Sequence, residues 1–464
     1  MLRLYADSSD QKNSPRYCDG ISRRSFVQLG VAGMASLGLG DVLKAKASGE
    51  AGRDKSKVST ILIWLDGGPG HMDMYDMKPD AAVEYRGIWS PIRTKVPGFD
   101  ITELYPLQAK HTDKFSVVRS LHHGTGDHFA GAHRMLTTKN MGVSGGNNIG
   151  KFPGIGAIVA QQRENLNRNV PPYVSVPTAS SVGRVPGYFS GKFLGVQYDP
   201  FMTKGDPNSD KFRVQNMVLP TGITVDRLDD RTRLRGELDK ITRDIESNGT
   251  FDALDQFDQQ AFNFVTGTKA RTAFDINQED DKLREKYGRN SWGQSTLLAR
   301  RLVEAGASFV TVHYGGWDHH WNLQGGYETL LPRVDAAVAG LFEDLSQRGL
   351  LDTTIVMLCG EFSRTPRMND GGNGGPPLSK GTPGRDHWGN SMFCLLGGGG
   401  IRGGQIIGST TSKGESAKDR PVTPANIHAT VYECMGIDPK LHILDHAGRP
   451  TPVLEDPTPI HELL

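Results

Sequence analysis

The chain has 464 residues, and its 53 basic side chains almost balance its 52 acidic ones, for a formal net charge of +1. A chain this close to neutral has no field that would draw it to nucleic acid or to an anionic membrane, so the expected partner is a small-molecule or glycan substrate. The mean hydropathy is −0.43, and no long apolar run follows the N-terminal region, which excludes a transmembrane span in the mature protein.

The first 47 residues have the order of features found in an export signal. Arg23 and Arg24 stand directly before a weakly apolar stretch over residues 26–43, which ends at the small-residue site Ala45-Lys46-Ala47. This order predicts a twin-arginine signal peptide over 1–47, export by the twin-arginine translocase, and a periplasmic or extracytoplasmic location. The alternative is an amphipathic N-terminal helix, which the glycines of this stretch would weaken.

The rest of the chain, residues 58–464, is expected to form a single α/β domain, because strand and helix signals alternate from end to end. Apolar, β-branched runs bounded by glycine or polar residues predict buried strands at 58–65, 115–121, 172–176, 308–313, 353–359 and 391–396. A helical section is expected at about 223–304, where apolar residues recur at helical spacing. The glycine- and proline-rich stretch 370–383 is expected to be a loop that borders the site.

Acidic residues follow three of these runs. Asp66, Asp318 and Glu361 come after the predicted strands at 58–65, 308–313 and 353–359. In open α/β sheets, ligands bind outside the carboxyl ends of the strands, so these carboxylates are expected to meet there. For Asp66 alone, the alternative is a helix cap in a tight turn.

Histidines near these carboxylates complete a candidate cation site. His71, His320 and His387 are the imidazole ligands we expect beside the three acidic residues. Carboxylates and imidazoles without thiolate favour zinc or manganese, whereas a site made mostly of carboxylates favours calcium or magnesium. The sequence therefore predicts one or two divalent metal ions and leaves the identity of the metal open.

Two arginines lie close to the expected ligands in sequence. Arg364 and Arg385 are candidates for holding an oxyanion through paired hydrogen bonds, and structural salt bridges are the alternative role for both.

Several motifs together carry a resemblance to a known family. The chain resembles the exported family catalogued as domain of unknown function 1501, over nearly all of its mature length. That family is similar to the alkaline phosphatase and sulfatase superfamily, whose members usually have a one- or two-metal centre. The motifs are Leu65-Asp66-Gly67-Gly68-Pro69, Gly316-Trp317-Asp318-His319-His320, Gly360-Glu361-Phe362-Ser363-Arg364-Thr365-Pro366, Gly384-Arg385-Asp386-His387-Trp388 and the glycine run from Gly397 to Gly404.

The resemblance implies both a fold and roles for individual residues. The implied fold is α/β, with an alkaline-phosphatase-like central mixed, mostly parallel sheet sandwiched by helices. Asp66 matches the superfamily's first-strand metal aspartate, and Asp318 with His320 resembles its middle aspartate–histidine pair. Glu361 stands where a late metal carboxylate is expected, and His387 is similar to the last histidine ligand.

The chain departs from the superfamily at the nucleophile. Sulfatases carry it nine residues before the threonine of a Leu-Thr-Gly ending, and counting back from Thr137 lands on His128. Formylglycine chemistry is therefore not available there. His128 is left as a metal ligand, a base or an imidazole nucleophile, with Thr125 as the fallback hydroxyl. Phe362 replaces the histidine that usually follows the late carboxylate, which puts a second metal site in doubt.

The predicted function is hydrolysis of phosphate or sulfate esters by an exported, metal-dependent enzyme. Either a metal-activated water or His128 would be the attacking group, while the metal neutralises charge on the ester oxygens. The alternative is a non-catalytic, metal-containing exported protein that binds a surface polymer or a partner protein.

Overall fold

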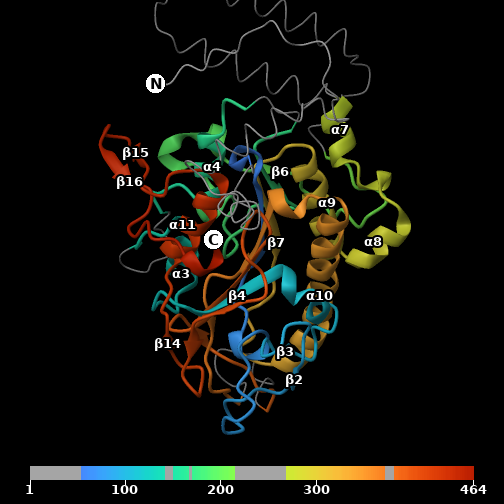
Figure 1. The fold of residues 1–464 in the computed structure, drawn as a ribbon, viewed down its shortest axis with the longest axis vertical. Coiled ribbons are helices and arrows are strands. Elements are labelled where there is room, and N and C mark those ends of the chain that lie inside the picture. Colours follow the sequence, from blue (N-terminus) through green and yellow to red (C-terminus); the bar gives the residue numbers. More distant parts are fainter. Residues whose placement is uncertain (1–53, 142–149, 167–169, 215–267, 371–380) are drawn as a thin grey trace, which may run out of the picture. The chain divides into compact units, whose positions relative to one another are not determined.

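The computed structural model describes residues 54–141, 150–166, 170–214, 268–370 and 381–464. The expected signal peptide over 1–47 lies outside these residues, as does most of the expected loop at 370–383. Residues Lys55–Leu464 form one compact unit, and its centre is an eight-stranded sheet (Figure 1).

All six strands predicted from the sequence belong to this sheet, each within one residue of its expected ends. The strand order across the sheet is β12-β4-β11-β8-β1-β7-β5-β6. The bounds are β1 Ser59–Leu65, β4 Phe115–Leu121, β5 Tyr173–Val176, β6 Phe201–Met202, β7 Phe309–Tyr314, β8 Thr354–Cys359, β11 Met392–Gly397 and β12 Ile406–Ile407.

The sheet is mixed but mostly parallel, as predicted. Strand β1 pairs in parallel with β7 and β8, and the pairs β5–β7, β5–β6 and β12–β4 are parallel too. Strand β11 is antiparallel to both of its neighbours, β4 and β8. The predicted α/β class with a mostly parallel mixed sheet is therefore confirmed.

Apolar cores lie on both faces of the sheet. Successive side chains of a strand point to opposite faces, so the buried strand β1 supplies both cores. Ile61 and Ile63 pack in one core with helices α9 (Ser291–Glu304) and α10 (Leu323–Gln347). Leu62 and Trp64 pack in the other core with α3 (His128–Thr137), α4 (Ile155–Gln162) and α11 (Pro424–Met435). The central sheet is thus sandwiched by helices, as Figure 1 shows.

The helices have the following bounds: α3 His128–Thr137, α4 Ile155–Gln162, α7 Thr268–Phe274, α8 Asp281–Tyr287, α9 Ser291–Glu304, α10 Leu323–Gln347 and α11 Pro424–Met435. Three of them, α7 to α9, fall within the expected helical section at about 223–304, of which residues 223–267 lie outside the described part. Among the described residues, no helix combines the length and apolar character needed to cross a membrane.

Short strands form four two-stranded pairs outside the central sheet. Of these, β9 and β10 matter most for the site, because their antiparallel pairing sets His387 opposite Arg364 and Trp388 opposite Ser363. The bounds are β2 Pro91–Ile92, β3 Ile101–Thr102, β9 Ser363–Arg364, β10 His387–Trp388, β13 Ser409–Thr410, β14 Ala417–Asp419, β15 His442–Leu444 and β16 Pro450–Pro452.

Candidate metal centre

The carboxylates expected at the sheet edge follow three adjacent strands. Asp66 comes directly after β1, which lies between β7 and β8, and those two strands lead to Asp318 and Glu361. The backbone N–H of Gly67 donates to both oxygens of Glu361, at 2.9 and 3.1 Å. Gly67 has φ +117°, and a Cβ there would lie 2.8 Å from the nitrogen of Asp318. The turn after β1 therefore requires glycine to bring these segments together.

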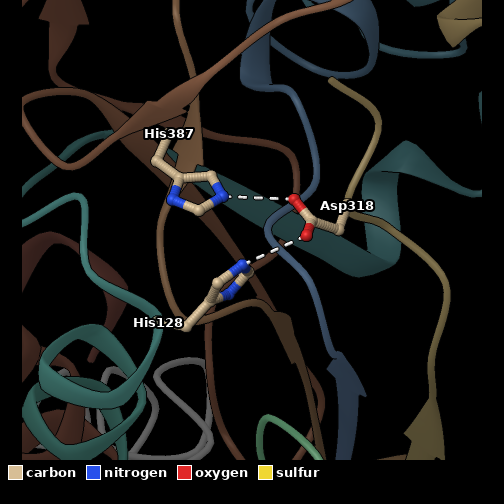
Figure 2. A group of neighbouring side chains, drawn as sticks. All are labelled: His128, Asp318 and His387. Atoms are coloured by element: carbon tan, nitrogen blue, oxygen red, sulfur yellow. Dashed lines mark hydrogen bonds and ion pairs between the residues drawn. The ribbon is translucent and has the colours of Figure 1, made fainter. Parts of the chain in front are cut away.

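Asp318 is the centre of a histidine cluster. The Nε2 of His320 lies 3.0 Å from its Oδ1, and the Nε2 of His387 lies 3.1 Å from the same oxygen. The Nε2 of His128 faces the other oxygen, Oδ2, at 3.3 Å. Figure 2 shows His387 and His128 pointing at the two oxygens from different segments of the chain. The side chain of Asp318 is 47% exposed, so the cluster is open to solvent.

The spacing within this cluster fits a small cation. The two Nε2 atoms of His320 and His387 are 3.0 Å apart, so these nitrogens and Oδ1 of Asp318 form a triangle with sides of 3.0 to 3.1 Å. Two ligands about 2.1 Å from a tetrahedral zinc ion are about 3.4 Å apart. His128, Asp318 and His387 form a wider group, in which one ligand atom from each lies within 4.8 Å of the others.

Each histidine of the cluster is anchored through its other ring nitrogen. The Nδ1 of His128 lies 2.7 Å from Oε1 of Glu361, that of His320 lies 2.8 Å from Asp386, and that of His387 lies 2.8 Å from the carbonyl oxygen of Gly126. Because all three neighbours are acceptors, each Nδ1 donates its hydrogen. Histidines that bind metals almost always have such a partner, which leaves the Nε2 lone pair directed at the ion.

The charges of the cluster shift its pKa values in the metal-free chain. Burial by itself lowers the pKa of His128, but the hydrogen bonds that its ring donates to Asp318 and Glu361, and the charges of those two residues, outweigh burial and raise the pKa to about 9. Burial opposes ionisation of Asp318, yet His128, His387 and Arg364 hold its pKa well below the usual range. Burial raises the pKa of Glu361. The carboxyl groups of Asp318 and Glu361 on either side of His128 therefore give a site whose negative charge a proton or a cation can neutralise.

Arg364 positions Asp318 from beneath the cluster. Its side chain is almost fully buried, and its Nη2 donates to Oδ1 of Asp318 at 2.5 Å and also to the carbonyl oxygen of Gly67. Its Nε donates to the carbonyl of Gly68 at 2.7 Å, and its Nη1 donates to that of Arg385 at 3.2 Å. Every nitrogen of the guanidinium thus has a protein acceptor.

Asp66 is held on the flank of the cluster. Its carboxylate accepts from the backbone N–H of Val182 at 2.9 and 3.2 Å and from the indole N–H of Trp64 at 3.1 Å. The Nε2 of His313 lies 3.2 Å away. The charge of Asp66 adds to the rise in the pKa of Glu361, but no contact among the described residues joins Asp66 to Asp318.

Three other residues singled out in the sequence have surroundings of their own. His71 is fully buried between Ser363, Ser391 and the carbonyl of Gly414, and burial lowers its pKa to about 4. Arg385 is also buried, and it donates to both oxygens of Asp73 at 2.8 and 3.1 Å. The Oγ1 of Thr125 accepts from the backbone N–H of Asp127 at 3.3 Å.

Two residues of this region were not singled out in the sequence. Asp386 anchors His320 and belongs to the motif Gly384-Arg385-Asp386-His387-Trp388. Its position directly before the candidate ligand His387 could have indicated a role at the site. His313 reaches Asp66 from within β7. A histidine inside an apolar strand carries no spacing signal of its own, so sequence reasoning had no means to find it.

The fold and the site together define a mixed α/β protein with a candidate metal centre at one edge of its sheet. Residues 57–464 match the model of a family described as protein of unknown function (DUF1501), and the chain belongs to this family. No curated protein matches the chain in sequence.

Solved structures with a similar arrangement come from sulfatases and related enzymes. The PsFucS1 sulfatase from Pseudoalteromonas sp. is 11% identical, with a TM-score of 0.35, covering 85% of this chain and 70% of that one. The phosphonate monoester hydrolase SpPMH from Silicibacter pomeroyi is 10% identical, with a TM-score of 0.38 and coverages of 82% and 73%. A protein in the alkaline phosphatase superfamily from Vibrio parahaemolyticus is 9% identical, with a TM-score of 0.36 and coverages of 82% and 66%.

Proposed function

We propose that this protein is an exported, metal-dependent hydrolase of phosphate or sulfate esters, with a small molecule or a glycan as the alcohol part of its substrate. One observation carries the proposal: three histidines, each anchored at Nδ1, turn their Nε2 atoms toward one half-exposed carboxylate, Asp318. Purely structural histidines have no need of such convergence, whereas a cation does.

The two oxygens of Asp318 divide the site into two parts. Oδ1 faces His320 and His387, and these three residues would hold the cation. Two imidazoles with one carboxylate favour zinc or manganese over calcium or magnesium. A divalent cation bound there would supply positive charge to the ester oxygens and lower the pKa of a nearby water.

His128 lies on the Oδ2 side and is the candidate for proton transfer. In its neutral form, with Nδ1–H donated to Glu361, its Nε2 accepts the proton of a water as the water oxygen forms its bond to phosphorus or sulfur and the bond to the leaving oxygen breaks. Glu361 then stabilises the imidazolium. Direct attack by Nε2 is the second route, and it would leave a phosphoryl or sulfuryl group on His128.

Arg364 acts through another residue in this scheme. Since each nitrogen of its buried guanidinium already donates to a protein acceptor, we assign it to orienting Asp318 and not to contacting the substrate. Asp66 and Glu361 add negative charge beside the cluster at Asp318. If the protein binds the second of the one or two expected metal ions, these two carboxylates would hold it. Arg385 and His71 take no part, because their hydrogen bonds are made within the protein interior.

Metal analysis combined with activity assays tests the proposal. The purified mature protein should contain close to one transition-metal ion per chain and should hydrolyse at least one of aryl phosphate monoesters, aryl phosphate diesters and aryl sulfates. The His128→Ala variant should keep its metal and lose turnover if His128 transfers the proton. It should lose both if His128 is a ligand, as the wider group with Asp318 and His387 allows.

Other outcomes of these assays decide against hydrolysis. Metal bound tightly without turnover of any ester, together with retention on a glycan or protein column, would favour the non-catalytic binding protein. Absence of both metal and turnover would reject a metal centre altogether.

The proposal of export rests on the sequence of residues 1–47. A reporter fused to this segment should be exported, and the double substitution Arg23→Lys plus Arg24→Lys should block that export. If the fusion with both substitutions were still exported, the twin-arginine translocase would no longer be part of the proposal. If neither fusion were exported, the periplasmic location would be rejected.

A further inference from the structure

Arg184 is a cation next to the candidate centre without a carboxylate partner among the described residues. Its guanidinium carbon lies 4.6 Å from the centre of the Phe129 ring, and Phe129 directly follows His128 at the start of α3. A guanidinium over an aromatic face is held by the cation–π attraction, which leaves its N–H donors free for another acceptor. The arginine therefore has a fixed place and spare hydrogen-bonding capacity.

The turn that carries Arg184 is fastened to the candidate centre. Ser181 and Arg184 exchange backbone hydrogen bonds of 3.1 Å, and the two residues between them have positive φ, +54° for Val182 and +73° for Gly183. Positive φ is unfavourable for a β-branched residue such as valine. It is maintained here because the Val182 N–H donates to Asp66. Val185, the next residue after Arg184, is 54% exposed, so this side of the turn faces solvent.

A second cation lies near Arg184. Burial lowers the pKa of Lys192, Asp199 raises it, and the positive charge of Arg184 lowers it further. Lys192 also has a positive φ, +50°, so its backbone position is constrained as well. Asp199 offsets part of the charge of Lys192, so Arg184 is the cation of this pair that is left without a carboxylate partner among the described residues.

We infer that Arg184, stacked on Phe129 and carried by the turn that holds Asp66, forms a subsite for a second anionic group on the substrate, with Lys192 as an auxiliary cation. This inference rests on the proposed function and narrows it: the natural substrate is an ester whose unreacted part carries another sulfate, phosphate or carboxylate. The planar donors of arginine suit the paired oxygens of such groups, and the lysine adds a point charge.

Matched pairs of substrates test the subsite. Once the class of ester is known, kcat/KM is measured for two sugar esters that differ only in a second, non-hydrolysed sulfate, and for the corresponding pair with phosphate. Arg184→Gln should lower kcat/KM for the doubly charged ester about tenfold, mainly through KM, and change that for the singly charged ester less than about twofold. Lys192→Gln should act in the same direction with a smaller effect, and Arg184→Lys should restore part of the loss.

The control is Arg93→Gln. Arg93 is an exposed arginine that follows β2, and it too has no ion-pair partner among the described residues. Loss of general surface charge would affect both arginine variants equally, whereas a subsite would be affected by Arg184→Gln alone. Thermal melting of each variant separates a misfolded protein from a weakened subsite, because the turn also holds Asp66.

Binding provides a readout that needs no turnover. Calorimetric titration of the His128→Ala variant with singly and doubly sulfated disaccharides, and with hexose mono- and bisphosphates, should show about tenfold tighter binding of the doubly charged ligands. That preference should disappear in the Arg184→Gln background. Equal affinity for singly and doubly charged ligands would overturn the subsite. No turnover of any ester by the wild type would instead overturn the hydrolase, so the two failures are distinguishable.

Discussion

Two aspartate–arginine pairs lie side by side in this protein and differ in what they leave open. Arg364 donates to Asp318 and Arg385 donates to Asp73, and the two arginines are joined through the carbonyl oxygen of Arg385. Asp73 is fully buried, and Arg385 takes both of its oxygens. Asp318 is 47% exposed, and both of its oxygens face histidines.

The contrast between Asp318 and Asp73 shows how a candidate metal ligand differs from a structural carboxylate. Both pairs consist of an aspartate and an arginine, and both arginines were candidates for holding an oxyanion in the sequence. The pair at Asp73 is closed off from solvent and has both oxygens held by Arg385, whereas the carboxylate of Asp318 is open to solvent and to a ligand. Unused coordination capacity, and not residue type, marks the candidate site.

The largest expected effect is that of Asp318→Asn on metal binding and turnover. Loss of the central carboxylate should reduce bound metal to less than about a tenth and lower kcat/KM roughly 10⁴-fold. The metal-free variant should lose less stability than Asp73→Asn does, because Asp318 is 47% exposed and the new amide oxygen can still accept from Arg364. Elemental analysis, ester hydrolysis and urea unfolding measure the three quantities. A variant that keeps both metal and activity would contradict the site.

The substitution Asp73→Asn should have the opposite profile. It leaves the buried guanidinium of Arg385 without its counter-charge, and breaking such a pair costs about 3–5 kcal/mol of the free energy of unfolding. Metal content per folded chain should not change. Urea unfolding measures the loss, with Asp113→Asn in the exposed pair with Lys95 as the control that should show little effect. If Asp73→Asn lost metal without losing stability, Asp73 and not Asp318 would be the residue on which metal binding depends.

Acid should weaken the interior more than the open site. Burial lowers the pKa of His428, which lies against the carbonyl oxygen of Met135, from 6.5 to about 4. The folded state therefore resists the proton that the unfolded chain accepts, and stability is complete above pH 6.5 and falls toward pH 4. One such histidine costs about 2 kcal/mol at pH 5.

The variant His428→Gln sharpens this expectation. The difference between its free energies of unfolding at pH 7 and pH 5 should be about 2 kcal/mol smaller than in the wild type. The exposed His442, replaced in the same way, should leave the difference unchanged. An identical pH dependence in the wild type and His428→Gln would mean that this buried ring does not set acid sensitivity.

The smallest effect is expected for Thr125→Ala. The hydroxyl of Thr125 accepts one hydrogen bond of 3.3 Å from Asp127, so kcat/KM should stay within about twofold of the wild type. Loss of all turnover on this substitution, with metal content preserved, would assign the attacking group to Thr125 in place of His128 or a water.

The strands of the sheet were largely predictable because each is a short, mostly apolar segment in the sequence. The six runs that were predicted as strands are mostly apolar, and five of them, all but 391–396, contain β-branched residues. Burial on both faces of the sheet favours that composition. Strand ends also located Asp66, Asp318 and Glu361 at one edge, since parallel strands end together.

The partners of each side chain were not predictable. Arg364 and Arg385 look alike in sequence, yet one reaches Asp318 and the other Asp73. His71 stands five residues after Asp66, but the turn between them directs its ring into the interior. These outcomes depend on pairings between segments 46 to 312 residues apart, which residue spacing does not encode.

The reversed direction of β11 has a consequence for how such centres are found. Residues that follow a parallel strand reach the carboxyl edge of the sheet, but a residue that precedes a strand of opposite polarity reaches the same edge. His387 arrives by this route, five positions before β11 begins. A scan confined to the downstream flanks of strands would miss every ligand of this kind. In a mixed sheet, the direction of a strand decides whether the residues before it or the residues after it lie at the edge that carries the site.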